Sequence, residues 1–248
     1  MTTSLIACGI LKAEVEAALS QRGLSAPVFY LAPAPCVEPK ALLRQLRTLL
    51  DRAAQVSDDI VVLIGRCHPE LDEILASYPA RRATINDCFD ALLGEERKLI
   101  DRESNTFYTS TAWLDHWQRA LRRSMQWGQV DARQNFGHYD RILLLDAGLK
   151  PVPDEKILEY FDYLQVPVEP HAITLDALGT LLSRYLGYGP QDGCLGCRAD
   201  RDPVSGRAPE SIPAIHQILR LDGRQSERNN GAKHGEQSGS GDDARTTG

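Results

Sequence analysis

The sequence predicts an α/β protein of three layers, in which helices cover both faces of a mainly parallel sheet. Two observations carry this prediction. Strand and helix patterns alternate from the first residues to about residue 190. The clearest strands, at 60–64 and within 140–148, are short continuous apolar runs, as expected for strands that are buried on both faces.

The first half of the chain alternates three strands with three helices. Helix 38–55 repeats leucines at three- and four-residue spacing, which is the pattern of one buried helix face. Pro69 suits the first turn of the helix that it begins. The expected elements are strands 5–8, 27–32 and 58–67, and helices 12–22, 38–55 and 69–78.

The same alternation continues through the second half. The apolar run of 140–148 ends in Asp-Ala-Gly, and helix 112–128 is amphipathic and rich in arginine. We expect helix 88–104 to break near Gly94. The other expected elements are strands 81–87, 106–111 and 168–173, and helices 154–164 and 174–186.

Residues 1–190 are thus expected to form one α/β domain, and residues 191–248 a Cys-x-x-Cys knuckle and a mostly disordered tail. The tail is polar and rich in glycine and serine, so it buries too little apolar surface to offset the entropy of ordering. Within it, apolar residues of 211–221 suit a short helix that docks on the domain or on a partner. A remnant turn explains them equally well.

The composition excludes several function classes. A formal net charge of −6 and an isoelectric point near 5.5 argue against a nucleic-acid partner. No apolar run approaches the roughly 18 residues of a membrane span, and no secretory signal begins the chain. We therefore expect a cytoplasmic protein whose six cysteines are reduced, which favours metal or redox roles over structural disulfides.

Three cysteines occupy equivalent places in the pattern. Cys8, Cys67 and Cys88 each lie on a connection that leads into a helix. Because the carboxyl ends of parallel strands share one edge of a sheet, the three thiols are expected to meet there. The positive end of the helix dipole favours the thiolate at each position.

Three neighbouring thiolates repel one another unless a cation lies between them. Thiolates suit zinc or a [4Fe–4S] cluster, and three protein ligands leave one position open for a substrate. The sequence does not distinguish these two cofactors. Packing in the core is the alternative, since unpaired cysteine is among the most buried residue types.

Three polar residues are candidates for catalytic roles beside these cysteines. His68 suits a further ligand or an acid–base group, and a solvated loop histidine is the alternative. Asp87 directly precedes Cys88, and Asp146 is expected to end a buried strand at the same sheet edge, where it is able to orient a substrate or to hydrogen-bond a metal ligand. Helix capping and turn formation are the commoner roles of such aspartates.

Three aromatic residues are expected to wall a substrate pocket beside the cysteines. Tyr108, Trp113 and Trp117 lie in the aromatic segment "TFYTSTAWLDHW". Core packing of an amphipathic helix explains Trp113 and Trp117 nearly as well.

The remaining cysteines give weaker signals. Cys194 and Cys197 form half of a zinc knuckle, which suits a regulatory thiol pair, an intermolecular metal ligand or no role. Cys36 follows the second expected strand in a proline-rich loop. Phosphate-binding loops, Gly-x-Ser-x-Gly and His-Glu-x-x-His are absent from the sequence.

Five segments occur in a characteristic order: "ACGIL", "GRC", "DCFDALLG", "TFYTSTAW" and "YDRILLLDAG". Together they resemble the uncharacterised prokaryotic family called domain of unknown function 1638, and the resemblance covers about residues 4–187. The family pattern has cysteines at the positions of Cys8, Cys67 and Cys88. The resemblance implies an association with corrinoid-dependent methyltransferase systems and one-carbon metabolism.

The chain departs from this pattern at Ser110 and Ala112, where threonine and glycine are usual, and its Asp-Ala-Gly replaces Asp-Thr-Gly. These changes put the substrate in doubt. The knuckle and the tail lie outside the resemblance.

Three functions are compatible with these features. The first is a metalloprotein, such as a zinc- or iron–sulfur-dependent transferase or lyase, that acts on a small thiol or methylated compound. The second is a non-catalytic accessory or chaperone protein for a methyltransferase or corrinoid protein. The third is redox chemistry by the thiols alone.

Overall fold

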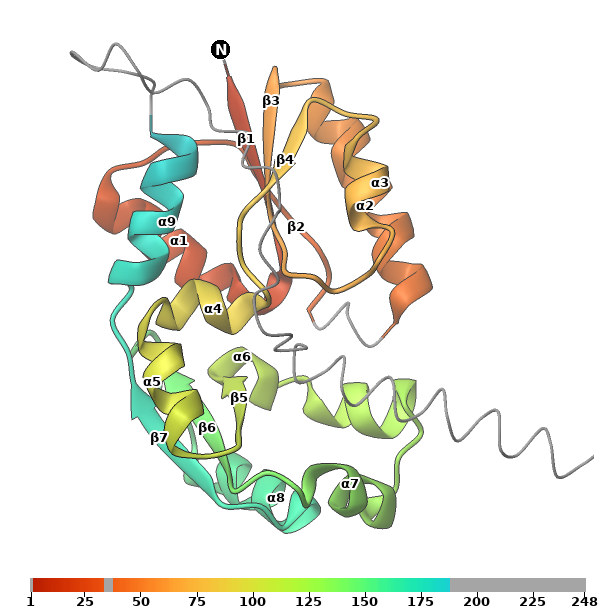
Figure 1. The fold of residues 1–248 in the computed structure, drawn as a ribbon, viewed down its shortest axis with the longest axis vertical. Helices are drawn as coiled ribbons and strands as arrows, with labels where there is room; N and C mark the ends of the chain where they lie inside the picture. Colours follow the sequence, from red (N-terminus) through yellow and green to blue (C-terminus); the bar gives the residue numbers. More distant parts are fainter. Residues whose placement is uncertain (1, 34–37, 188–248) are drawn as a thin grey trace, which may run out of the picture.

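The computed structural model describes residues 2–33 and 38–187 (Figure 1). The strand pairings in this part of the chain are all parallel. The predicted α/β class is confirmed. The strands divide into two sheets, however, with the orders β2-β1-β3-β4 and β5-β6-β7.

The four-stranded sheet is built by the first part of the chain. Alternate side chains of its central strands enter two different apolar clusters: Leu5 and Val61 face one, and Ile6 and Val62 face the other. Leucines of α2 and α3 fill the second cluster, and α1 and α9 pack on the opposite side. Its elements are β1 (Thr3–Ala7), α1 (Lys12–Arg22), β2 (Val28–Tyr30), α2 (Pro39–Ala54), β3 (Asp59–Leu63), α3 (Leu71–Leu75) and β4 (Ala80–Arg82).

Two short helices lead to the three-stranded sheet, and a last helix returns to the first. Helix α9 packs against α1 and α4, which ties the end of the described chain to its beginning. The elements are α4 (Cys88–Leu93), α5 (Glu96–Glu103), β5 (Thr106–Ser110), α6 (Thr111–Leu114), a π-helix (Arg119–Ser124), α7 (Gln129–Phe136), β6 (Arg141–Asp146), α8 (Asp154–Leu164), β7 (Val168–Ala172) and α9 (Asp176–Leu186).

Most expected elements match within a few residues, including the break near Gly94. The single helix expected at 112–128 is wrong, because the chain forms α6 and then a separate π-helix there. Helix α7 was not expected. Its only buried residues are Ala132 and Phe136, so its sequence has little of the periodicity that marks a helix.

The carboxyl ends of the two sheets face each other across the middle of the molecule (Figure 1). The 3₁₀-helix Gly9–Leu11, which follows β1, contacts α6, which follows β5. Ser124 in the π-helix donates a hydrogen bond of 2.8 Å to Glu38 beside α2. Residues next to the ends of strands in both sheets therefore lie in one central region.

In the described ranges, no helix combines the length and the apolar character needed to cross a bilayer. Cys36, the Cys194/Cys197 knuckle, the segment 211–221 and the expected disordered tail lie outside the described residues.

Candidate functional site

The sheet register brings two of the candidate cysteines to one edge. Ala7 and Leu63 are partners at the ends of β1 and β3. Cys8 follows β1 directly, and Cys67 lies in the connection after β3. Cys88 is the first residue of α4.

A glycine allows the connection after β3 to approach the residues before Cys88. A Cβ atom on Gly65 would lie 2.3 Å from the carbonyl oxygen of Asn86 and 2.4 Å from the Cα of Asp87. The backbone N–H of Arg66 donates to that carbonyl at 2.7 Å. The backbones that carry Cys67 and Cys88 are thus in direct contact.

Cys8 and Cys88 form the close pair of this region. Their side chains are hydrogen-bonded, and this bond lowers the pKa of Cys8 below its ordinary value against the opposing effect of burial. The backbone of Ile10 adds a smaller lowering contribution to the pKa. Cys8 is 4% exposed and Cys88 is partly exposed, and neither is in a disulfide bond. The pair therefore offers a stabilised thiolate beside a second sulfur.

Cys67 lies near this pair without joining it. Burial, and then the charges of Cys8 and Asp87, raise its pKa to about 12. Its side chain packs in the apolar cluster of α2 and α3, whereas Cys8 and Cys88 pack in the other cluster. Across residues 2–33 and 38–187, no three His, Cys, Asp or Glu side chains are gathered as a metal site would require. The donor chemistry suits a soft metal, but only two of the three thiols are in contact.

Asp87 has a structural role that accounts for its position. Its Oδ1 accepts hydrogen bonds from the backbone N–H groups of Phe89 and Asp90, at 2.9 and 3.0 Å, and so caps α4. Arg97 donates to the same oxygen at 2.5 Å. Asp87 thereby fixes the start of the helix on which Cys88 lies.

His68 and Asp146 are held in turns. His68 Nδ1 accepts a hydrogen bond of 3.1 Å from the backbone N–H of Glu70. Asp146 Oδ1 accepts one of 2.8 Å from Gly148. Asp146 ends β6 in the second sheet, so it does not share an edge with the cysteines as the sequence suggested. Its strand instead points toward the central region from the opposite side.

Tyr108 and Trp113 lie in the core of the second sheet. The Tyr108 hydroxyl donates to Asp101 at 2.5 Å, and Trp113 Nε1 donates to the Tyr160 hydroxyl at 3.1 Å. They are 1% and 3% exposed. Their partners and burial fit the core-packing alternative better than the wall of a pocket.

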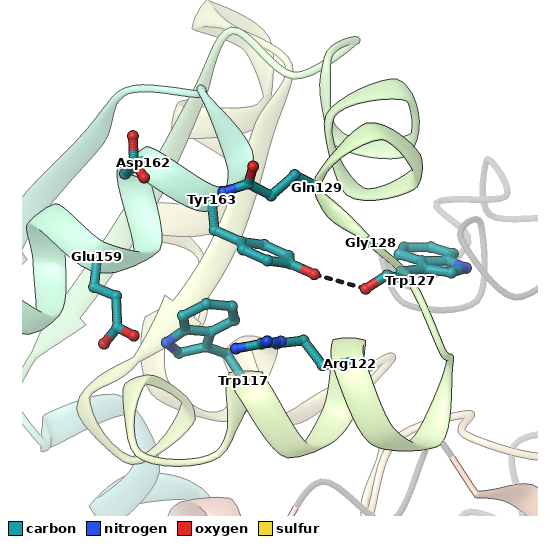
Figure 2. A pocket seen from close by; sticks show the side chains of 8 residues that line it. All are labelled: Trp117, Arg122, Trp127, Gly128, Gln129, Glu159, Asp162 and Tyr163. Carbon is teal, nitrogen blue, oxygen red and sulfur yellow. Dashed lines mark hydrogen bonds between the residues drawn. The ribbon is translucent and has the colours of Figure 1, made fainter.

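A pocket of about 370 Å³ does lie among the helices of the second sheet (Figure 2). Trp117, Trp127 and Tyr163 contribute to its lining, and the Tyr163 hydroxyl donates to the carbonyl oxygen of Trp127 at 2.6 Å. The Arg122 guanidinium lies 6.0 Å from the centre of the Tyr163 ring. None of Cys8, Cys67 and Cys88 lines this pocket.

The sequence did not indicate the partly buried Arg97 or the buried Glu14. Arg97 pairs with both Asp87 and Asp90. In the sequence, the only indication that Arg97 forms ion pairs was Asp101, four residues later on the same helix. Glu14 is 3% exposed, and its Oε2 has no hydrogen-bond partner among the described residues. Burial raises the pKa of Glu14, with Lys150 opposing. An acidic residue in a first helical turn is usually solvated, so no sequence signal marked it.

Comparison with known proteins identifies one family. The family described as "protein of unknown function (DUF1638)" matches residues 31–182. This span contains Cys67 and Cys88 and begins after Cys8. No curated protein and no solved structure matches the chain. Since the matched span is more than half of the 248 residues, the chain belongs to the DUF1638 family.

Proposed function

We propose that this protein binds a thiophilic metal ion through Cys8 and Cys88, with Cys67 as a third ligand. The hydrogen bond between the Cys8 and Cys88 side chains carries the proposal. Two sulfurs in contact at a carboxyl sheet edge, one of them favoured as thiolate, are the donors that zinc and iron–sulfur clusters select.

The position of Cys67 is compatible with this role if its side chain turns toward the pair. The charge of Cys8 is among the causes that raise the pKa of Cys67, which supports this arrangement. Without a cation, burial and the neighbouring negative charges keep Cys67 protonated. A bound cation would remove the repulsion among the three thiolates, and the Cys67 proton would be released.

Burial favours metal binding over thiol exchange. Reactive redox cysteines are usually partly exposed, because a second thiol must reach the sulfur. Cys8 is 4% exposed, which hinders a bulky reactant and admits a small ion.

Three protein ligands would leave one coordination position for a small thiol or methylated compound, which the ion would hold as an activated ligand. A place in one-carbon metabolism, beside corrinoid or methyltransferase proteins, belongs to the same proposal. An accessory role would instead give copurification with such a protein while the cysteine site stays empty.

Metal analysis tests the proposal. Full-length protein purified without oxygen is expected to contain about one zinc, or to show the brown chromophore of an iron–sulfur cluster. Cys8→Ser and Cys88→Ser should each lose the metal, and Cys67→Ser should weaken its retention.

A Cys194→Ser/Cys197→Ser double variant is the control for metal held by the knuckle, and it should keep the bound metal. Cys8→Ser protein that retains wild-type metal content would refute the proposal, as would wild-type protein that takes up neither zinc nor iron.

A second candidate is favoured by the same sulfur contact. Cys8 and Cys88 would form a disulfide through the partly exposed Cys88, which first takes one half of a small disulfide such as oxidised glutathione and releases the other half as a thiol. The buried Cys8 would then displace the attached glutathione, so that two electrons and two protons pass to glutathione in all. Mass spectrometry after alkylation would detect a linked Cys8–Cys88 peptide in oxidised protein. Its absence after treatment with excess oxidised glutathione would exclude this candidate.

A further inference from the structure

A second and larger cavity lies next to the segments that carry Cys67 and Cys88, since Arg66 and Asn86 line it. It has a volume of about 640 Å³ and is lined by residues of the connection after β3, the segment before α4, helices α4 and α5, and α9. This volume is in the range of small-molecule sites. None of the cysteines within the described ranges lines it, so an inference about this cavity does not require metal binding.

Two guanidinium groups at this cavity have no partner among residues 2–33 and 38–187. Arg66 and Arg102 both line it and are exposed. Within the described part of the chain, neither side chain makes an ion pair, a hydrogen bond or a ring contact. Each guanidinium has five N–H donors in a planar fork that matches carboxylate and phosphate groups. The two arginines come from different segments of the chain but line the same cavity, where a single ligand would be able to meet both.

The acidic residues of the cavity already have hydrogen-bond or ion-pair partners within the protein. Asp90 accepts hydrogen bonds from Arg97 at 2.5 Å and from the backbone N–H of Asn86 at 2.8 Å. Asp101 accepts from the Tyr108 hydroxyl and pairs with Arg97. Their negative charge is therefore compensated within the protein, and the unpaired charge at the cavity is positive.

Glu95, the third acidic residue of the lining, directly precedes α5 and pairs with Lys98 of that helix at 2.6 Å. This exposed pair is screened by solvent and does not bind to the two arginines.

The rest of the lining includes an apolar surface. Ile85 and Ala91 are buried, and Ala177 and Leu181 of α9 are partly buried opposite them. A hydrated inorganic ion would leave this surface unused. An organic anion covers it with its carbon body and places its charged end between the arginines.

We propose that this cavity binds a small organic anion, with a carboxylate or phosphate group held by Arg66 and Arg102 and an apolar body against α4 and α9. Carboxylate and phosphate ligands of this kind have the same two parts, a planar or tetrahedral oxyanion and a short carbon chain.

The test is calorimetric titration of the full-length protein with butyrate, butyl phosphate and butylamine, which share one carbon chain and differ in charged group. At least one of the two anions should bind, and the tighter of them identifies carboxylate or phosphate as the preferred group. Arg66→Gln and Arg102→Gln should each weaken that binding about tenfold, the effect of losing a charge-assisted hydrogen bond.

Arg44→Gln is the matched control, because Arg44 is exposed on α2 and lines no part of the cavity. It should bind the anion as the wild type does, and thermal unfolding should be unchanged in all three variants. Three outcomes would overturn the proposal: binding of neither anion, anion binding that is the same in all three variants, and binding of butylamine as tight as that of the anions.

Discussion

Arg97 on α5 holds Asp87, the residue that caps α4, with a distance of 2.5 Å between Arg97 Nη1 and Asp87 Oδ1. The same nitrogen contacts Asp90 at 2.5 Å, and the guanidinium lies 4.7 Å from the centre of the Tyr108 ring on β5. Burial by itself would lower the pKa of Arg97, but the surrounding carboxylates outweigh it and raise that pKa. Arg97 thus links the helix that carries Cys88 to the second sheet.

Removing this guanidinium should destabilise the protein strongly. Arg97→Met leaves Asp87 and Asp90 as partly buried charges without their cation, and we expect a loss of about 3 kcal/mol in the free energy of unfolding. Urea denaturation measures it. Lys98→Gln on the same helix is the control and should change the free energy by less than about 0.5 kcal/mol, because its ion pair is exposed. A similar loss in both variants would contradict the role of Arg97.

Two substitutions of Asp87 separate its capping from its charge. Asp87→Ser keeps a side-chain oxygen that is able to cap α4 but loses the ion pair with Arg97. Asp87→Ala loses both. We expect Asp87→Ser to be more stable than Asp87→Ala by about 1 kcal/mol, the usual contribution of a helix cap. Equal unfolding free energies of the two variants would mean that the cap contributes nothing.

The contact at Gly65 should tolerate no side chain. In Gly65→Ala, the new Cβ would meet the backbone of Asn86 and Asp87 at 2.3 and 2.4 Å, and backbone atoms are not free to rotate away. We expect a loss of roughly 2–3 kcal/mol and a changed reactivity of Cys67 and Cys88 toward iodoacetamide.

The control for this substitution is Gly128→Ala. Its Cβ would have its nearest neighbour at 3.6 Å, in ordinary contact with Asp131. A cost below about 1 kcal/mol is expected there. A Gly65→Ala protein as stable as the wild type would show that the two connections are able to separate.

Glu14 should make stability depend on pH. Since burial raises its pKa, the folded state keeps this proton at pH values where the unfolded state has lost it. The contribution of Glu14 is therefore fully present below its ordinary pKa and is lost as the pH rises through the raised value. Lys150 offsets part of this loss.

Glu14→Gln has no titrating group at this position, so it should be more stable than the wild type at pH 7, where ionising the buried carboxyl costs the wild type stability. The difference should shrink toward pH 4, as measured by thermal unfolding across that range. Glu16→Gln, in the exposed Lys12–Glu16 pair of the same helix, should show no such trend. A wild type that is more stable than Glu14→Gln at pH 7 would mean that the carboxylate is charged and favourably paired.

The local pattern of the sequence predicted most of the fold. The α/β class, the parallel direction and the bounds of α1, α2, α8 and α9 follow from hydrophobic periodicity, which depends on neighbours in the chain. The same pattern placed Cys8, Cys67 and Cys88 on connections next to helices. It also offered capping and turn formation for Asp87 and Asp146, and both aspartates make those contacts.

The tertiary structure decided what meets in space. An apolar run predicts a strand but not the strand with which it pairs. The division into two sheets, which places β6 in a different sheet from the strands beside the cysteines, could therefore not be predicted from the sequence. Nor does spacing along the chain tell which layer a side chain enters: Cys8 and Cys88 share one apolar cluster, and Cys67 enters the other. The burial of Glu14 and the partners of Arg97 depend in the same way on segments distant in the chain, because desolvation and ion pairing are set by packing between elements.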